Sequence, residues 1–351
     1  MTREVPSRRY VVLAEGRFSD RRAKTAHGLI RYGRANAEVV AVIDSALAGR
    51  RVLEVMPSLR RDAPIVGTLR EALEYSPTSI LVGLAPAGGR LPEAWMAFLR
   101  EALEAGLEVV SGLHQRLAPE FPGGKVWDVR EPPEDVPLFS GEGFDVEAKV
   151  ALTVGTNSAI GKLTATLEIE RAARERGLAA EFVPTGQTGI IIAGWGICVD
   201  AVVSDFAAGA SEQLVLEAAR RGRELILVEG QGALGHPAYS GVTTAQLHGS
   251  CPDCLILCTD ASEEEVFARV PHPDVKRIAR LYEGVAALVK PAQVVAVSVN
   301  TKGLVEDTAK AFIEDVAATT GLPTADPVRG SAAPILDAIL QAPKTATVGR
   351  L

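Results

Sequence analysis

Residues 150–177 read VALTVGTNSAIGKLTATLEIERAARERG, and this stretch decides the fold of the second half of the chain. An apolar run ends at Gly155, a loop of small residues follows, and Gly161 and Lys162 open a segment whose apolar residues recur at helical spacing. A strand, a glycine loop and a helix N-terminus together supply the inward-turned N–H groups and the lysine that phosphate binding requires. The sequence therefore predicts a P-loop-like domain. The residues expected to bind a phosphate-bearing cofactor are Gly155, Thr156, Asn157, Ser158, Ala159, Ile160, Gly161, Lys162, Leu163 and Thr164.

Two features of this loop differ from those of a nucleotide-hydrolysing P-loop. Thr156 stands where the first glycine of the motif usually falls, and Leu163 follows the lysine where Ser or Thr normally holds Mg²⁺. Thr164 comes one position later, on a different part of the helix face. These departures argue against a nucleotide-hydrolysing enzyme and leave phosphate binding intact. The alternative is a tight strand-to-helix turn with a solvated lysine.

The rest of the chain predicts two α/β domains. Its 351 residues are too many for one ordinary core, and residues 131–147 are rich in Pro, Gly and acids and lack periodicity. We expect a Rossmann-like parallel sheet in residues 1–135, a linker at 136–147 and a P-loop NTPase-like three-layer α/β/α domain in residues 148–351. The expected strands are 10–16, 38–44, 79–84, 107–112, 148–155, 179–186, 224–230, 254–260 and 294–300. The expected helices are 19–33, 93–105, 162–176, 211–221, 262–269, 274–288 and 304–319.

Composition limits the partners and the compartment. The net charge of −7 and the absence of a basic run argue against nucleic acid as a partner. No apolar run is long enough to cross a bilayer, and the N-terminus does not look like a signal peptide. Four cysteines give no disulfide framework, so we expect a cytoplasmic protein, and we expect a homo-oligomer. Cys251, Cys254 and Cys258 are typical of a buried strand, and we expect no metal site.

Several side chains near the predicted strand ends are candidates for catalysis. Glu229 follows a strand beside the phosphate loop, where open α/β sheets bind ligands, and is a candidate base; an ion pair with a lysine is the alternative. The Gly230-x-Gly232-x-x-Gly235 pattern after it is followed by His-Pro rather than a helix, which excludes a dinucleotide fingerprint. His236 and His248 bracket a loop and suit deprotonation of an amine, although such histidines are often structural.

The segment 186–212 offers further polar candidates in a glycine-rich, apolar context. Asp205 is a candidate acid or base, with helix capping as its alternative role. The residues expected to bind the substrate are Thr188, Gly189, Asp200, Ser240 and Arg329. Arg329 can bind a carboxylate through two hydrogen bonds, and Asn300, at the end of the last strand, can pair with an adenine edge; turn formation is the alternative for both.

The first half carries weaker signals. Asp44 ends a strand where dinucleotide-binding folds place a ribose-binding acid, but the first loop lacks the glycine fingerprint, so NAD binding is not expected. Its basic residues either face an anion or form a solvated helix face, and the solvated face is favoured. These residues are Arg17, Arg21, Arg22 and Lys24.

The stretches GTNSAIGKLTATLEIERAARERG, PTGQTGIIIAGWGICVDAVVSDFAAGASE, VEGQGALGHPAYSGVTTAQLHGSCPD and LPTADPVRG resemble the D-glutamate N-acetyltransferase-like family, long described as a domain of unknown function. That resemblance implies a Rossmann-like domain followed by a P-loop-like one, and acetyl transfer from acetyl-CoA to the amine of D-glutamate. The loop at 155–162 would then hold CoA phosphates. The P-loop segments are also similar to dethiobiotin synthetase, which implies an ATP- and Mg²⁺-dependent ligase or kinase as the alternative. A non-catalytic nucleotide or CoA sensor is the third possibility.

Overall fold

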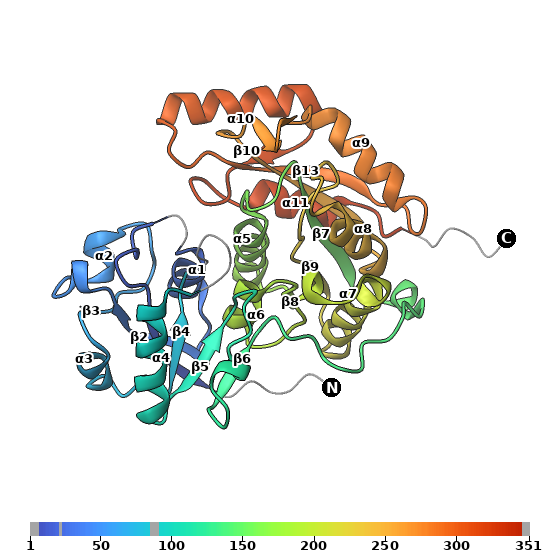
Figure 1. Cartoon of the computed structure of the whole chain (residues 1–351). Coiled ribbons are helices and arrows are strands. Elements are labelled where there is room, and N and C mark those ends of the chain that lie inside the picture. Colours follow the sequence, from blue (N-terminus) through green and yellow to red (C-terminus); the bar gives the residue numbers. More distant parts are fainter. Residues whose placement is uncertain (1–6, 21–22, 85–90, 346–351) are drawn as a thin grey trace. The chain divides into compact units, whose positions relative to one another are not determined.

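The computed structural model describes residues 7–20, 23–84 and 91–345. The chain divides into two compact units (Figure 1). Unit 1 comprises residues 1–132 and 186–201, and unit 2 comprises residues 133–185 and 202–351. Within the described residues, no helix combines the length and the apolar character needed to span a membrane.

Unit 1 is built on a six-stranded sheet of order β3-β2-β1-β4-β5-β6 in which every pair is parallel. Its strands are β1 (Arg8–Leu13), β2 (Ala37–Ile43), β3 (Ile65–Val66), β4 (Ser79–Val82), β5 (Glu108–Ser111) and β6 (Val126–Asp128). Its helices are α1 (Lys24–Tyr32), α2 (Val52–Val55), α3 (Leu69–Leu73), α4 (Glu93–Glu104) and α6 (Gln187–Ala193). The apolar carboxyl-terminal halves of β1 and β2 and all of β4 are buried, as parallel strands covered on both faces require.

Helix α6 belongs to unit 1 although its sequence lies within the P-loop-like half. The Oγ1 atoms of Thr25 in α1 and Thr188 in α6 lie 3.2 Å apart, and Arg130, after β6, donates to Gln187 at 3.2 Å and to Asp200 at 3.0 Å. The apolar residues of α6 are buried, which explains why the segment packs onto a core. The division into units therefore differs from the sequence-based one, which placed residues 186–201 in the second domain.

Unit 2 also has a six-stranded, all-parallel sheet, of order β14-β13-β10-β7-β9-β8. Its strands are β7 (Lys149–Gly155), β8 (Ala180–Val183), β9 (Leu225–Val228), β10 (Cys254–Asp260), β13 (Gln293–Asn300) and β14 (Thr324–Ala325). Its helices are α5 (Lys162–Glu175), α7 (Ser204–Arg220), α8 (Ser240–Gly249), α9 (Val275–Ala286), α10 (Glu306–Thr320) and α11 (Ala333–Gln341).

Alternate residues of β13 show that helices cover both faces of this sheet. Ala296 packs in a core with α5 and α11, whereas Val297 and Val299 pack with α9 and α10. The predicted class, two α/β domains with parallel sheets, is confirmed.

The predicted helix at 262–269 is wrong. The segment forms an antiparallel hairpin of β11 (Glu265–Phe267) and β12 (Val270–Pro271), in which Ala268 and Arg269 turn with φ of 47° and 73°. The Nδ2 atom of Asn157 donates to the carbonyl oxygen of Val266 at 3.2 Å. The Glu, Ala and Arg residues favour a helix locally, but contacts with the distant loop hold the extended form.

The expected linker is anchored to unit 2 by one buried carboxylate. Glu212 in α7 accepts hydrogen bonds from the backbone N–H groups of Ser140, Gly141 and Gly143 at 2.6, 2.8 and 3.0 Å. Its side chain is buried, so these three donors are satisfied away from water. The proline-rich segment is therefore a fixed part of the unit.

Replacing Glu212 by Ala should lower the free energy of unfolding by roughly 3–5 kcal/mol, because three N–H groups lose their charged acceptor. Chemical denaturation of the two proteins measures this loss. Glu217→Ala, on the same helix and paired with Arg221 nearer the surface, is the control and should cost about 1 kcal/mol or less. Equal losses for the two variants would contradict the anchoring role of Glu212.

Candidate functional site

The loop between β7 and α5 has the backbone of an anion-binding turn. Gly161, directly before α5, has a φ of 112°, and Ala159 has a φ of 58°. A Cβ atom on Gly155 would lie 2.9 Å from Ile160 Cδ1 and 3.2 Å from Lys162 Nζ, so a larger residue there would displace these two side chains. The N-terminus of α5, with its free N–H groups, points at whatever the loop holds.

Lys162 is the buried cation of this loop. Its side chain is only 6% exposed, and its Nζ donates to the carbonyl oxygen of Asn157 at 2.8 Å. Burial lowers the pKa of Lys162 to about 8, against the opposing influence of Cys258 and Glu229. The ammonium therefore stays mostly protonated at neutral pH but is poorly compensated, which favours an incoming anion.

The side chains of the loop are occupied in holding its shape. Thr156 Oγ1 donates to Thr259 Oγ1 at 3.1 Å, and Asn157 Nδ2 donates to Glu263 at 2.7 Å. Ile160 is buried, whereas Ser158, Leu163 and Thr164 are half-buried. Asn300 donates to the Ile160 carbonyl oxygen at 3.3 Å and to Asp260 at 2.6 Å, so its amide supports the loop. Backbone N–H groups and Lys162 are therefore the parts of the loop suited to a ligand.

Glu229, at the end of β9, lies beside Lys162. The next residue, Gly230, packs so closely that an added Cβ would lie 1.7 Å from the Thr153 carbonyl oxygen and 3.3 Å from Lys162 Cδ. Glu229 is buried, and its Oε2 accepts the N–H of Thr185 at 3.1 Å. Gln246 in α8 donates to the Glu229 carbonyl oxygen at 3.2 Å. Strand ends and a helix thus hold Glu229 in place, and its carboxylate raises the pKa of Lys162 against the effect of burial.

Tyr282 in α9 ties the loop after β9 to the phosphate loop. Its hydroxyl donates to the carbonyl oxygen of Gly155 at 2.8 Å and accepts the N–H of Leu234 at 3.0 Å. The ring is fully buried, and burial raises the pKa of Tyr282 to about 12. The hydroxyl therefore remains a donor and brings the segment that carries His236 to the same edge of the sheet.

His236 has one ring nitrogen already engaged. Its Nδ1 accepts the backbone N–H of Ala238 at 3.1 Å, so the neutral ring carries its proton on Nε2. The ring stacks on Tyr239 at 4.4 Å and lies 5.2 Å from the ring of Phe267, measured between centroids. Burial and the charge of Lys162 lower the pKa of His236. A neutral imidazole that presents an N–H donor is the result.

Other predicted residues of unit 2 lie outside this group. Asp205 is exposed in the first turn of α7, and Ser240 begins α8. His248 Nε2 lies 3.1 Å from the Val285 carbonyl oxygen, a contact between α8 and α9. The Arg329 guanidinium contacts Glu306, the carbonyl oxygen of Leu304 and Thr301, so its donors hold a loop.

Three predicted substrate-binding residues belong to unit 1. Thr188 and Gly189 are buried in α6, and Asp200 pairs with Arg130. Asp44 accepts the N–H groups of Phe18 and Ala46, a capping role. Arg17 pairs with Asp20 and Lys24 begins α1, whereas Arg21 and Arg22 lie outside the described residues.

The four cysteines are buried and form no disulfide: Cys198, Cys251, Cys254 and Cys258. Burial raises the pKa values of Cys251, Cys254 and Cys258 to about 12, so these three stay protonated. Among the described residues, no three His, Cys, Asp or Glu side chains are grouped as metal ligands.

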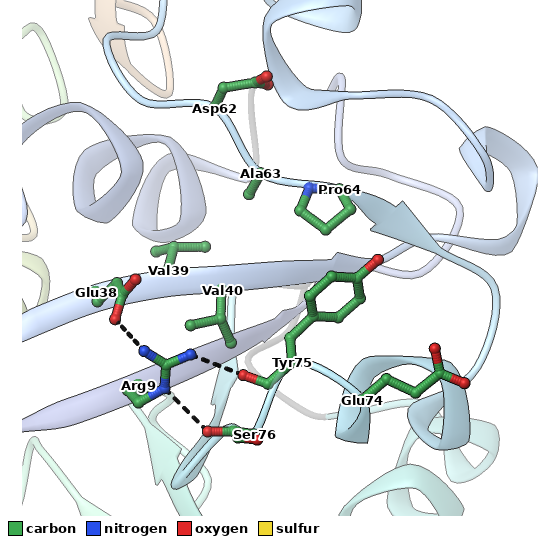
Figure 2. Close-up of a pocket in the computed structure, with 10 residues that line it drawn as sticks. All are labelled: Arg9, Glu38, Val39, Val40, Asp62, Ala63, Pro64, Glu74, Tyr75 and Ser76. Atoms are coloured by element: carbon green, nitrogen blue, oxygen red, sulfur yellow. Dashed lines mark hydrogen bonds and ion pairs between the residues drawn. The ribbon is translucent and has the colours of Figure 1, made fainter.

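Of two cavities, one lies at the amino edge of the unit 1 sheet and the other lies beside the phosphate loop of unit 2. One of about 360 Å³ lies at the amino ends of β1 and β2 in unit 1 (Figure 2). There Arg9 donates to Glu38 at 2.6 Å and to the carbonyl oxygens of Tyr75 and Ser76 at 2.8 and 3.0 Å. Ligands of open α/β sheets bind at the opposite edge. The other cavity, of about 240 Å³, lies in unit 2 beside Thr259 and Glu263, which hold the phosphate loop.

Sequence reasoning missed the supporting residues of the site. The side chains of Thr185, Gln246 and Tyr282 each donate to a backbone carbonyl oxygen of the segments that carry Lys162 and Glu229. Tyr282 is 127 positions from Gly155, and its sequence surroundings carry no motif. The only signal was the polar character of Thr185 and Gln246 within glycine-rich segments.

Both halves of the chain match the two domains of one protein family. Residues 45–132 match the Rossmann-like domain, and residues 137–336 the P-loop domain, of a domain of unknown function, DUF1611. A protein of Tritonibacter scottomollicae named D-glutamate N-acetyltransferase is 36% identical over 284 residues, which cover 78% of this chain and 84% of that one. A protein of the same name from Pseudoalteromonas sp. is 34% identical over 270 residues, covering 74% and 80%. The crystal structure of a DUF1611 family protein from Anabaena variabilis is 38% identical, with a TM-score of 0.88 over 95% of this chain and 99% of that one.

The depressed pKa of Lys162 makes stability depend on pH in a defined direction. Between pH 8 and the ordinary lysine value, the unfolded chain binds the proton that the folded chain has lost, so this residue's contribution to stability rises with pH. The unfolding free energy of the wild type minus that of Lys162→Met should therefore increase by about 2–3 kcal/mol between about pH 7.5 and 10. Denaturation at several pH values measures the difference. Lys310→Met, at an exposed site on α10, should show no such slope; a flat difference for Lys162→Met would contradict its depressed pKa.

Proposed function

The chain belongs to the DUF1611 family, and from that premise we propose that it is an N-acetyltransferase that moves the acetyl group of acetyl-CoA to the amino group of D-glutamate. The names of two relatives, each at least 34% identical over most of the chain, support the reaction and the substrate. The observation that carries the proposal is the group at the carboxyl edge of unit 2. There Lys162, in a loop whose backbone suits an anion, interacts electrostatically with a buried carboxylate, Glu229, and with the imidazole of His236.

This group supplies what acyl transfer to an amine requires. An amino acid arrives as an ammonium ion, so a base must take one proton before the nitrogen can attack. Glu229 is the base in this proposal. The nitrogen then forms a bond to the thioester carbonyl carbon, and the carbonyl electrons move to the oxygen. When that intermediate collapses, the C–S bond breaks, and the second amine proton passes to the CoA thiolate.

His236 is assigned a different role from the one expected from its sequence. Because Nδ1 accepts the N–H of Ala238, the ring has no free lone pair with which to act as a base in its neutral form. Its Nε2–H can instead donate to the carbonyl oxygen as negative charge develops there. The lowered pKa of His236 keeps the ring in this neutral form at neutral pH.

The reaction itself is tested by incubating the protein with D-glutamate and acetyl-CoA. We expect free thiol and N-acetylglutamate in equal amounts, measured with a thiol reagent and by mass spectrometry. L-Glutamate and D-aspartate under the same conditions define the substrate. Because Leu163 occupies the position of the Mg²⁺-binding hydroxyl, Mg²⁺-ATP should give no ADP. ADP release in place of acetylation would favour a ligase or kinase, and binding without turnover would favour a sensor.

Two variants of His236 distinguish a donor from a base. His236→Gln keeps an N–H donor on a side chain of similar reach, whereas His236→Ala has none. We expect kcat to fall about 10²–10³-fold in the Ala variant and at least tenfold less in the Gln variant. The acidic limb of the kcat/KM pH profile should persist in both, because it reports Glu229. Equal losses, with that limb abolished, would make His236 the base.

A further inference from the structure

We propose that the loop at 155–162 holds the carboxylate of the acceptor amino acid rather than the phosphates of CoA. This inference rests on the proposed acetyl transfer and names which of the two anionic substrates occupies the loop. The family resemblance implied CoA phosphates, and three observations favour the amino acid instead.

The first observation is proximity. Lys162 and Glu229 influence each other's charge, and Lys162 also influences His236. The Lys162 side chain also lies directly against the backbone that carries Glu229, through Gly230. An anion held by Lys162 is therefore adjacent to the catalytic groups. In an α-amino acid the carboxylate and the amine share one carbon atom. In acetyl-CoA the whole pantetheine arm separates the phosphates from the thioester, so a diphosphate on Lys162 would leave the reacting carbonyl far from Glu229 and His236 unless the arm folded back.

The second observation is the charge around the loop. Against the single ammonium of Lys162 stand three carboxylates that touch the loop or its immediate supports. Glu229 lies beside the lysine, Glu263 accepts from Asn157, and Asp260 accepts from the Asn300 amide that also contacts Ile160. A diphosphate would add two more negative charges there. With Leu163 in place of the usual hydroxyl, the loop also lacks the ligand that positions a compensating Mg²⁺.

The third observation is the pattern of charge. The N–H groups at the start of α5 and the Lys162 ammonium form a positive pole, and the buried Glu229, whose neighbour Gly230 packs against the Lys162 side chain, supplies a negative pole that acts on this ammonium. An amino acid presents the complementary pair, a carboxylate joined through one carbon to an ammonium. Bound in this way, its ammonium lies against Glu229, which is the group that must take its proton.

The inference is tested by asking which substrate loses affinity when Lys162 is removed. We would measure KM for D-glutamate and for acetyl-CoA in the wild type, in Lys162→Met and in Lys310→Met, an exposed lysine of α10. Losing a buried, charge-assisted hydrogen bond should raise KM for D-glutamate about 10- to 100-fold in Lys162→Met. KM for acetyl-CoA should stay within about threefold, and Lys310→Met should change neither constant.

A donor without phosphates sharpens the comparison. With S-acetyl-N-acetylcysteamine in place of acetyl-CoA, the effect of Lys162→Met on KM for D-glutamate should be unchanged. If the loop holds CoA phosphates, the variant instead raises KM for acetyl-CoA and has no effect with the phosphate-free donor, and that result overturns the inference. A wild type that does not acetylate D-glutamate at all refutes the proposed function, a separate outcome.

Should Lys162→Met fail to fold, the wild type alone can show which substrate the loop holds. Titration of Lys162, with its pKa of about 8, removes the loop's cation as pH rises. Between pH 7 and 9, KM for D-glutamate should rise while the affinity for CoA, measured by calorimetry, stays constant. Weakening of CoA binding over this range, with no change for D-glutamate, overturns the inference.

Discussion

A lysine removed from water must have acceptors and counter-charges around it, and in unit 2 the loops at the carboxyl edge of the sheet are arranged to meet this requirement for Lys162. The carbonyl oxygen of Asn157 accepts from its ammonium, and Glu229 supplies a stabilising carboxylate. Neither group compensates the charge fully, since the pKa of Lys162 is lowered to about 8. The protein thus keeps a cation in a place where an incoming anion improves its environment.

Holding that arrangement requires rigid supports, and these come from neighbouring strands rather than from the loop itself. Thr156 is bound to Thr259 in β10, and Asn157 is bound to Glu263 after that strand. Gly230 is bound to Thr153 in β7, and Tyr282 joins Gly155 to Leu234. Such hydrogen bonds fix the loops before a ligand arrives, so little ordering remains to be done on binding. The absence of glycine at 156 is explained in the same way, since the Thr156 hydroxyl is one of these supports.

The parts of the molecule that local sequence determines were predictable, and those that depend on distant partners were not. Strand β10 coincides with the predicted 254–260 because an uninterrupted buried apolar run needs no outside information. The hairpin at 265–271 was predicted as a helix because its Glu, Ala and Arg residues favour one, while the hydrogen bond from Asn157 that opposes it comes from more than 100 positions away. Motif and strand position likewise single out Lys162, Glu229 and His236 as candidates, which stay predictions. The hydrogen bonds that occupy the Arg329 guanidinium, and the contact of His248 with α9, depend on packing that no local pattern encodes.

The departures of the loop from a nucleotide-hydrolysing P-loop then have one physical explanation. Phosphoryl transfer needs a metal because negative charge accumulates on the transferred group, and the hydroxyl after the lysine positions that metal. Acyl transfer to an amine develops one negative charge on one oxygen, for which a single neutral donor such as the Nε2–H of His236 is sufficient. A metal close to Glu229 would compete with the substrate ammonium for the same carboxylate and would lower its basicity. In the proposed reaction, Leu163 in place of the hydroxyl therefore keeps a metal away from Glu229, so the altered loop fits amine chemistry better than phosphoryl transfer.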